Sequence, residues 1–296
     1  MIIDSHVHIM PQYRLDGLTY WLGKGFTDHP LANMKITENW VINELCRKGV
    51  DYIFNLVFPI KSRETDDLNL FNLNLSKKNK QIIPFGSIHV ENEDKKRIVD
   101  RCILEYGFYG FKMHPYVQGF SINDERLFPV YARLEELGKP INIHTGFDEY
   151  YPNNASPITL SGIEELITRF SGLIFILPHM FYPRLEEAVY LIETYENVYI
   201  DTTNIYSAII QDEQKGVNRD KLREILYATL ERYYKRMVFG SDSPCGMSDI
   251  DTIYGDFYGF NLNEKIKKEI LFKTPCKIIG VELPERKEQE DTVNGK

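Results

Sequence analysis

Residues 4 to 8 read Asp4-Ser5-His6-Val7-His8, and this short run lies almost at the first residue of the chain. In an extended strand, alternate side chains point to the same face of the sheet. The imidazoles of His6 and His8 can therefore reach one point, which is how a strand chelates a metal ion. A His-x-His pattern alone is weak evidence, so the rest of the chain decides what it predicts.

Three further side chains of the metal-ligand type each end an apolar, β-prone run. They are His144, His179 and Asp242, and the runs before them are rich in Ile, Val, Phe and Leu. Chance rarely places such residues at several strand ends, and buried ionisable groups are costly to retain as packing alone. The pattern therefore predicts a metal centre assembled from the ends of strands.

Eight apolar runs alternate with amphipathic helical stretches along the chain. The predicted strands are Ile2–His8, Tyr52–Phe58, Ile82–His89, Gly110–His114, Ile141–His144, Leu173–His179, Val198–Thr203 and Met237–Asp242. Successive strand ends are roughly 24 to 50 residues apart, the size of a β-loop-α-loop unit. Strand and helix repeated eight times predict an α/β fold, a (β/α)₈ TIM barrel. Active sites of such barrels lie at the C-terminal ends of the strands, where all five candidate side chains fall.

Helix signals between the strands agree with this fold. The predicted helices are Glu38–Arg47 after Thr37, one from Asn123 or Asp124 to Leu137, one from Pro183 to Tyr195, and one from Asn218 to Tyr234. We expect one domain over 1–282 and a charged, frayed tail over 283–296. The segments 10–35, 146–158 and 204–217 exceed simple connectors, so we expect extended rim loops there that form lids or substrate pockets.

The composition narrows the function classes. The 296 residues are 43% hydrophobic and 26% charged, with a net charge of −8, which suits a globular protein with a sizeable core. No basic patch stands out, so we expect no nucleic-acid partner. No apolar run is long enough to span a membrane, and the polar motif at 4–8 excludes a targeting core there. The four scattered cysteines, among which Cys245 follows the strand that ends at Asp242, suggest reduced thiols and a cytoplasmic location.

These motifs together resemble the amidohydrolase superfamily. The resemblance rests on His6-Val7-His8, His144-Thr145-Gly146, His179 and Phe239-Gly240-Ser241-Asp242-Ser243-Pro244, and it extends from Ile3 to about Gly280. The runs Gly110–Pro115 and Tyr199–Thr203 also fit its amidohydrolase-related, barrel-only branch. That branch includes metal-dependent hydrolases and nonoxidative decarboxylases. One departure is Met180, which stands where the family usually has glycine.

The donor set suits a divalent metal ion. His6, His8, His144 and Asp242 supply three nitrogens and one oxygen, so we expect Zn²⁺ first and Mn²⁺ or Fe²⁺ as alternatives. Such an ion lowers the pKa of bound water towards roughly 7. The family resemblance gives His179 the role of catalytic acid or base, and Asp242 could share it. Asp4 could orient an imidazole from behind.

Lys112 lies on the predicted fourth strand and has two interpretations. Other branches of the superfamily carboxylate a lysine on this strand to bridge two metal ions, whereas one metal ion is usual in the branch that this chain resembles. We therefore expect one ion per chain, and Lys112 could instead bind a substrate carboxylate. His114, on the same face, and Arg63, just after the second strand, are further candidates for substrate binding.

Two catalytic functions and one non-catalytic function fit the sequence. The first is a metal-dependent hydrolase that uses metal-activated water on a small-molecule ester, lactone or amide. The alternative is a metal-dependent nonoxidative decarboxylase, a lyase, of a carboxylated aromatic or dienoic molecule. A metal-binding barrel without activity is a third class. In each case the partner is a small molecule, and by analogy with the branch a homodimer is expected.

Overall fold

The computed structural model describes residues 1–151 and 158–284. Eight strands form one sheet in sequence order, and every neighbouring pair is parallel. The strands are β1 (Ile3–Val7), β2 (Tyr52–Leu56), β3 (Ile82–Ser87), β4 (Phe111–Met113), β5 (Ile141–Ile143), β6 (Phe175–Pro178), β7 (Val198–Asp201) and β8 (Met237–Val238). All eight predicted strands are confirmed, each shorter than expected, and β8 has two residues where six were predicted. Together with the helices outside them, they confirm the (β/α)₈ TIM barrel.

Backbone bonds between the first and last strands close the barrel. The amide of Ser5 donates to the carbonyl of Phe239 at 3.0 Å, and the amide of Asp242 donates to the carbonyl of His6 at 2.8 Å. A further bond of 2.8 Å joins the amide of His8 to the carbonyl of Ser243. Closure therefore places the His-x-His run directly beside the segment that carries Asp242.

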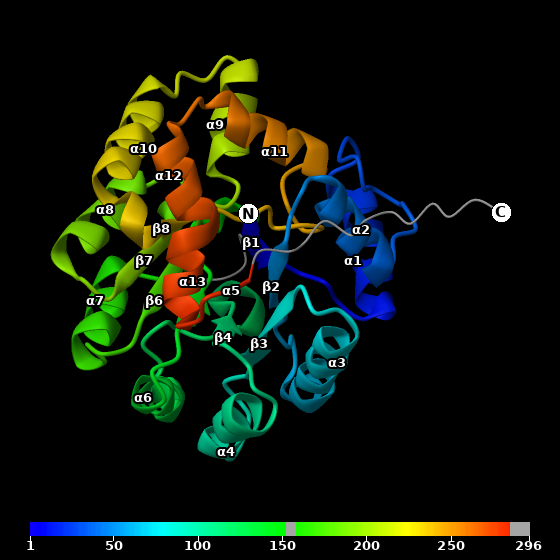
Figure 1. Ribbon diagram of the computed structural model, residues 1–296, viewed down its shortest axis with the longest axis vertical. Coiled ribbons are helices and arrows are strands. Elements are labelled where there is room, and N and C mark those ends of the chain that lie inside the picture. Colours follow the sequence, from blue (N-terminus) through cyan, green and yellow to red (C-terminus); the bar gives the residue numbers. More distant parts are fainter. Residues whose placement is uncertain (152–157, 285–296) are drawn as a thin grey trace.

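Helices surround the barrel in Figure 1. They are α1 (Gln12–Gly25), α2 (Glu38–Arg47), α3 (Thr65–Lys78), α4 (Lys95–Asp100), α5 (Pro115–Gln118), α6 (Phe128–Glu136), α7 (Leu160–Arg169), α8 (Leu185–Thr194), α9 (Ile205–Gln214), α10 (Asp220–Tyr233), α11 (Ile250–Gly259), α12 (Glu264–Lys268) and α13 (Thr274–Ile279). The helix predicted over Glu38–Arg47 is confirmed to the residue, because the hydroxyl of Thr37 accepts from the amide of Trp40 at 3.1 Å and caps it.

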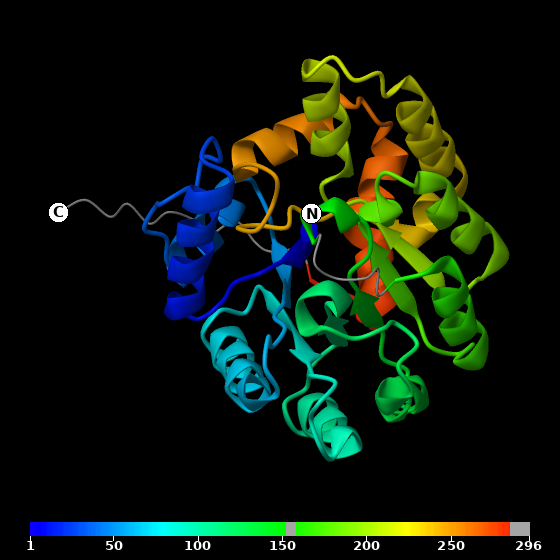
Figure 2. The ribbon, with the colours of Figure 1, turned by 180° about the vertical axis from the view of Figure 1, so that it is seen from behind.

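Two apolar clusters hold these layers together. The larger fills the space between the strands and the outer helices, with Val7, Phe111 and Ile143 among its fully buried members. The smaller lies inside the barrel and contains Phe54 and Phe85, whose rings are 5.1 Å apart. Residues of α13 complete it, and Figure 1 shows this helix across the face of the barrel opposite the site. Figure 2 shows the other face, with α1, α9 and α11 around the barrel mouth.

Two of the expected rim loops contain helices. The segment 10–35 forms α1, and the segment 204–217 forms α9. The first was missed because Gly17, Gly23 and Gly25 lower helix propensity and because Pro11 offers no side-chain cap. The second begins at Asn204, whose backbone is left-handed and whose side chain does not cap the helix. The part of the third segment over 152–157 lies outside the described residues.

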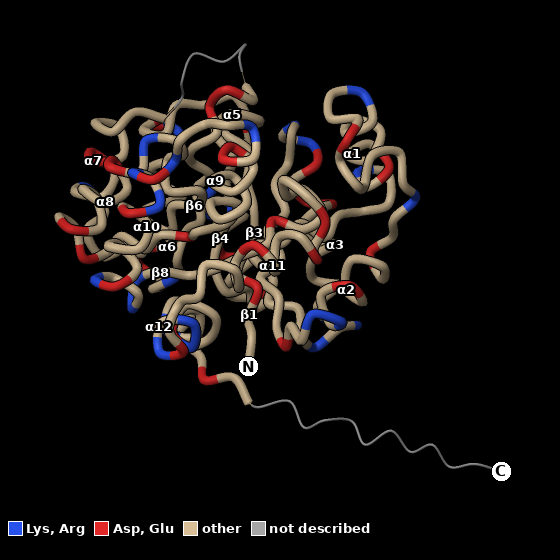
Figure 3. The backbone as a smooth tube through the Cα atoms, turned by 90° about the horizontal axis from the view of Figure 1, so that it is seen from above, with Lys and Arg blue, Asp and Glu red and all other residues tan. Residues whose placement is uncertain are grey.

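The expected tail begins on the barrel itself. Leu283 packs against the smaller apolar cluster, and the carbonyl of Pro284 accepts a hydrogen bond of 2.9 Å from the hydroxyl of Tyr52. Leu283 and Pro284 thus contact the barrel, the frayed tail stays a prediction, and 285–296 lie outside the described residues. In the described ranges, no helix is long and apolar enough to cross a bilayer. Figure 3 shows charges of both signs interspersed over the outer elements.

Candidate metal centre

Three buried donor atoms converge at the barrel mouth. Nε2 of His6 lies 3.2 Å from Nε2 of His8, and Oδ1 of Asp242 lies 3.6 Å and 3.0 Å from these two atoms. Among the described residues, this is the group of His, Cys, Asp and Glu side chains close enough together to hold one metal ion. The predicted meeting of strand one with strand eight is therefore present in the structure.

Hydrogen bonds behind the imidazoles determine which nitrogens face the centre. Nδ1 of His8 lies 2.5 Å from the carbonyl of Leu56, and since a carbonyl can only accept, Nδ1 carries the proton. Nδ1 of His6 lies 2.6 Å from Oδ2 of Asp201, so it donates to this carboxylate. Both Nε2 atoms then present lone pairs to each other and to Asp242. Three acceptors without a proton between them repel one another unless a cation lies among them, so the donor set fits a metal ion.

The carboxylate behind His6 is Asp201, and the expectation for Asp4 was wrong. Asp4 instead accepts from the backbone amides of Ser241 and His6, and from the hydroxyl of Tyr254 at 3.1 Å. The carboxylate of Asp4 is thus occupied by the backbone after β8 and by Tyr254, and it bonds to no imidazole. Asp201 ends β7, and its pKa is raised to about 7 by burial, which outweighs the opposing hydrogen bonds from Thr203 and the charge of Lys112. Sequence reasoning placed Asp201 in a family motif but gave it no role.

Glycine at position 240 allows the first and last strands to meet closely. A Cβ atom there would lie 2.3 Å from Cβ of His6 and 2.6 Å from its backbone nitrogen. Any larger residue would push β1 away from the segment that carries Asp242. The carboxylate of Asp242 is itself held by the side-chain amide of Asn204, which donates to Oδ2 at 2.8 Å. Burial opposes ionisation of Asp242, but the neighbouring imidazoles of His8 and His179 and the charge of Lys112 keep its pKa below the usual value.

Lys112 lies beside the centre and is fully buried. Its Nζ donates to Oδ1 of Asn142 at 2.8 Å and to Nε2 of His6 at 3.2 Å. Burial lowers the pKa of this ammonium to about 8, although Asp242 and Asp201 oppose the shift. Lys112 therefore contributes a positive charge that competes for the lone pair of His6.

His144 and His114 form a stacked pair next to the three-residue cluster. Their ring centroids are 3.8 Å apart and their planes differ by 13°. Nε2 of His144 is buried, and within the described residues it has no hydrogen-bond partner. Nε2 of His114 lies 3.4 Å from the hydroxyl of Tyr151. His144 thus lies at the predicted rim but outside the cluster of His6, His8 and Asp242, and its role as a fourth ligand stays a prediction.

His179 presents a free ring nitrogen to the same space. Its Nδ1 lies 3.0 Å from the carbonyl of Thr203, so Nδ1 carries the proton and Nε2 carries a lone pair. That Nε2 is buried and, in the described part of the chain, has no partner. The backbone of His179, Met180 and Phe181 is left-handed, which turns the chain sharply at the end of β6. Burial lowers the pKa of His179 to about 4.

A cavity of about 290 Å³ opens next to these side chains. It is lined by His144, His179 and Asp242, by Cys245, Gly246 and Met247 of the loop after β8, and by the residues Trp21, Leu22, Phe26, His29, Phe147, Tyr150, Tyr151, Asn204, Gln211 and Lys215. All three segments that were expected at the rim, 10–35, 146–158 and 204–217, contribute to this lining. Burial raises the pKa of the Cys245 thiol well above its usual value, so it enters the cavity wall as a neutral group.

The predicted substrate-binding residues are not part of the cavity lining, and their roles stay predictions. Arg63 is exposed on a short 3₁₀ turn over Ser62–Glu64 and is not part of the cavity lining. His114 and Lys112 lie behind His144 and His6 and do not line the cavity either. The guanidinium of Arg14 instead contacts the loop after β2, where it donates to the carbonyl of Phe58 at 2.7 Å.

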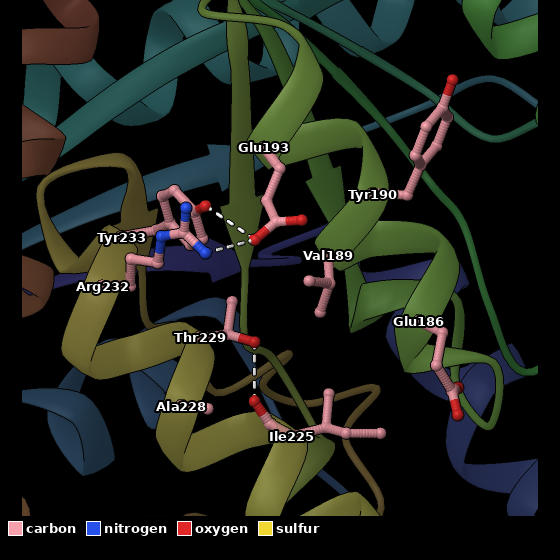
Figure 4. A pocket seen from close by; sticks show the side chains of 9 residues that line it. All are labelled: Glu186, Val189, Tyr190, Glu193, Ile225, Ala228, Thr229, Arg232 and Tyr233. Atoms are coloured by element: carbon pink, nitrogen blue, oxygen red, sulfur yellow. Dashed lines mark hydrogen bonds and ion pairs between the residues drawn. The ribbon is translucent and has the colours of Figure 1, made fainter.

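A second hollow lies on the outside of the barrel. Figure 4 shows it between α8 and α10, where Val189 and Ile225 face each other and Glu193 pairs with Arg232 at 2.7 Å. None of the predicted site residues is near it. The candidate site is therefore the cavity at the barrel mouth.

A family model described as "Amidohydrolase" matches residues 3–281. The curated relatives include 2-amino-3-carboxymuconate-6-semialdehyde decarboxylase of Dictyostelium discoideum, which is 34% identical over 172 residues, 48% of this chain and 48% of that protein. Protein fluG of Emericella nidulans is 32% identical over 100 residues, 33% of this chain and 11% of that protein. The chain thus spans less than half the length of either relative.

The solved structures include a similar barrel with a bound metal ion. It is 5-carboxyvanillate decarboxylase from Novosphingobium aromaticivorans, complexed with manganese and 4-hydroxy-3-methoxy-5-nitrobenzoic acid. The TM-score is 0.65 at 12% identity, and the likeness covers 95% of this chain and 96% of that one. At this identity the likeness supports the fold alone.

Proposed function

Because this chain belongs to the amidohydrolase family, we propose that it is a metal-dependent hydrolase that acts on an ester, lactone or amide of a small molecule. The observation that carries the proposal is the convergence of three lone pairs, on His6, His8 and Asp242, beside a cavity. Two nitrogens and one oxygen from the protein leave positions open on a divalent ion. Such an ion, when bound, polarises a substrate carbonyl and makes water more acidic.

His144 is proposed as a further ligand. It ends β5 next to the three-residue cluster, and its unpartnered, buried Nε2 is the kind of group that a metal ion would satisfy. Asp201 would hold His6 in the tautomer that binds the ion, and the carbonyl of Leu56 would do the same for His8. A nitrogen-rich set suits Zn²⁺ and also accepts Mn²⁺ or Fe²⁺, and we propose one ion per chain.

His179 would act as the catalytic base. Its Nε2 carries a lone pair and faces the cavity, so it can accept a proton from attacking water. Asp242, which also lines the cavity, can share this task. Hydrolysis begins with the removal of a proton from water, whereas decarboxylation needs a proton donor. The unprotonated Nε2 of His179 therefore favours hydrolysis.

A nonoxidative decarboxylase is the second candidate function. A curated relative that is 34% identical over 48% of the chain is named as a decarboxylase, and the structurally similar barrel that holds manganese is also named as one. In this alternative, His179 would have to bring a proton to the carbon that loses CO₂. Lys112, whose ammonium contacts Nε2 of His6 behind the cavity, would then add positive charge to the centre.

The substrate class, the cellular location and the oligomeric state are proposals as well. We propose a small-molecule substrate rather than nucleic acid, since charges of both signs are interspersed over the surface. A cytoplasmic location and a homodimer are proposed as well.

The test is a paired substrate screen on protein loaded with Zn²⁺ or Mn²⁺. One panel holds esters, lactones and amides, and the other holds carboxylated aromatic and dienoic acids, with released acid and released CO₂ measured separately. Turnover of acyl substrates alone supports the hydrolase. Release of CO₂ alone would replace it with the decarboxylase, and metal binding without turnover in either panel would support a barrel without activity.

A further inference from the structure

Residues 12–34, named here the α1 unit, form a compact outgrowth of the first βα connection. The chain runs out along α1 and returns beside it, and the amide of Asn33 donates to the carbonyl of Thr19 at 2.9 Å. The side chain of Asn33 occupies the space over Gly23, where a Cβ atom would lie 2.2 Å from Oδ1. The helix and the returning segment are therefore joined to each other as one body.

The α1 unit forms one wall of the cavity at the barrel mouth. Trp21, Leu22, Phe26 and His29 line it, and the rings of Trp21 and Phe26 are 4.9 Å apart. The ring of Phe26 lies 5.8 Å from that of Tyr150, which lines the cavity from the segment after β5. The position of the unit thus decides how wide the cavity opens.

Two side chains in the described part of the unit hydrogen-bond to other loops of the rim. Arg14 reaches the loop after β2, donating to the carbonyl of Phe58 at 2.7 Å and to Glu64 at 2.8 Å. His29 reaches the loop after β8, where its Nε2 donates to the carbonyl of Gly246 at 2.9 Å. The first tie is a guanidinium–carboxylate pair that keeps its charge throughout the neutral range. The second depends on the protonation state of an imidazole.

His29 uses both ring nitrogens, and this arrangement requires the neutral ring. While Nε2 donates to Gly246, Nδ1 accepts from the backbone amide of Leu31 at 3.1 Å. A second proton on Nδ1 would face the N–H of Leu31 and would replace an attraction with a repulsion. We propose that His29 is a proton-sensitive latch, a positioning residue that holds the α1 unit against the loop after β8 and loosens as the imidazole becomes charged.

The surroundings of His29 support this assignment. Asp249, beyond Gly246 on the loop after β8, is the acid that faces the ring and favours its charged form. The other titratable side chains that line the shared cavity are Cys245, Tyr150, Tyr151, Lys215, His144, His179 and Asp242, so Asp242 is a further acid of this cavity. Burial of the half-exposed ring lowers the pKa of His29 below its usual value and outweighs both the hydrogen bond to Gly246 and the charge of Asp249, which favour the charged form. The closed arrangement thus disfavours protonation, so acidification favours opening.

The chain contains a matched histidine that does not line the cavity. Nδ1 of His89 accepts from the amide of Glu91, again two residues further on, at 3.1 Å, and the ring also bonds to the backbone of Ile60 on the loop after β2. Its pKa is lowered mainly by burial as well. The loss of this tie would loosen another part of the rim, so His89 is a control for general damage.

By setting how wide the cavity opens, the latch would also control access to a bound metal ion, and this consequence rests on the proposed function. The latch itself does not depend on that function. Amide hydrogen exchange measures the latch on the metal-free chain and needs no substrate. The variants are His29→Leu, which removes both hydrogen bonds, His29→Gln, which keeps a donor for Gly246 but cannot be protonated, and His89→Leu as the control. Each variant is compared with the wild type at the same pH, so that intrinsic exchange rates cancel.

At pH 7.5 we expect His29→Leu to reduce protection of residues 20–34 roughly tenfold, and His89→Leu to leave it unchanged. At pH 5.5 we expect protection of the wild type to fall roughly tenfold relative to His29→Gln, because an open His29 with its ordinary pKa is then mostly charged. Equal protection of 20–34 in the wild type and His29→Leu, or an equal loss in His89→Leu, would overturn the latch. If His29→Leu does not fold, the pH comparison with His29→Gln decides alone.

Release of bound Zn²⁺ to a chelator at pH 7.5 tests the control of access. Faster release from His29→Leu than from His89→Leu supports it. Equal rates would overturn this role of the latch, while the exchange result would still stand. An absence of metal binding would count against the proposed function without affecting the exchange experiment.

Discussion

Nδ1 of His6 lies 2.6 Å from Oδ2 of Asp201, and both side chains are fully buried. The carboxylate fixes the tautomer of the imidazole, so Nε2 is left free for the candidate metal ion. Thr203 in turn holds Asp201, since its hydroxyl and its amide both donate to Oδ1. This chain of contacts connects the end of β7 to the candidate ligand His6 on β1, and it identifies Asp201 as the side chain that would position that ligand.

Replacement of Asp201 is expected to weaken metal binding. Asp201→Asn keeps the size of the side chain but loses the charge that orients His6, and we expect the affinity for Zn²⁺ to fall about 10- to 100-fold. Competition with a chromophoric chelator measures it. Asp4→Asn is the matched control, because Asp4 is equally buried but bonds to no imidazole. An affinity that falls equally in both variants would show that buried charge alone, and not the contact with His6, is responsible.

A substitution of Lys112 tests how many metal ions each chain binds. Its ammonium competes for the lone pair of His6, so Lys112→Met is expected to retain one metal ion per chain and to bind it several-fold more tightly. Metal content by mass spectrometry, on protein purified without chelator or nickel, gives the stoichiometry. About two ions in the wild type and a large loss in Lys112→Met would instead identify a carboxylated, bridging lysine.

The stacked imidazoles of His144 and His114 allow a paired comparison. Phenylalanine at either position can keep the stack but removes the ring nitrogens. We expect His144→Phe to lower the metal content or affinity markedly and His114→Phe to retain it, because His144 lines the cavity together with Asp242 and its buried Nε2 has no partner among the described residues, whereas His114 does not line the cavity and its Nε2 contacts Tyr151. The two variants share their volume change, so a difference between them reports ligation. Identical metal binding in both would remove His144 from the ligand set.

The sequence was informative wherever periodicity or strand ends carried the signal. Apolar runs predicted all eight strands, and the positions of His6, His8, Asp242 and His179 at strand ends predicted where the site lies. The contact of Asp201 with His6 was not predicted, because the spacing of a carboxylate at a strand end does not show which ring it faces. Asp4 was assigned to an imidazole for the same reason. Rim residues such as His29 and Trp21 depend on how α1 folds back over the barrel, and that packing follows from contacts distant in sequence.

His179 is expected to be needed for catalysis but not for metal binding. Its Nε2 faces the cavity without a partner, while Nδ1 is occupied by the carbonyl of Thr203. His179→Gln removes the proton acceptor, so we expect kcat to fall about 10²- to 10⁴-fold while the metal content is unchanged. Parallel kinetics and metal analysis on whichever substrate panel responds provide the check. A loss of metal together with activity would make His179 a ligand instead.

Metal-free protein is expected to lose stability as pH falls below about 6.5. Burial lowers the pKa of His6, His114, His144 and His179, so the unfolded chain binds more protons than the folded one between the ordinary histidine pKa of 6.5 and the lower folded values. Each fully shifted histidine then costs about 1.4 kcal/mol of stability per pH unit. Asp4 and Asp201 act in the opposite direction, because their pKa values are raised to about 6 and about 7 and the folded state gains their protons first.

Four histidines outnumber two carboxylates, so the net stability should fall between pH 7.5 and pH 5.5. Urea unfolding of the metal-free chain at these two pH values measures the change as a shift of the midpoint at constant slope. Bound Zn²⁺ is expected to raise stability at pH 7.5 and to enlarge the difference, since protons compete with the ion for the imidazoles. A midpoint that rises on acidification would mean that the imidazoles are already charged in the fold, and three converging lone pairs would then no longer describe the centre.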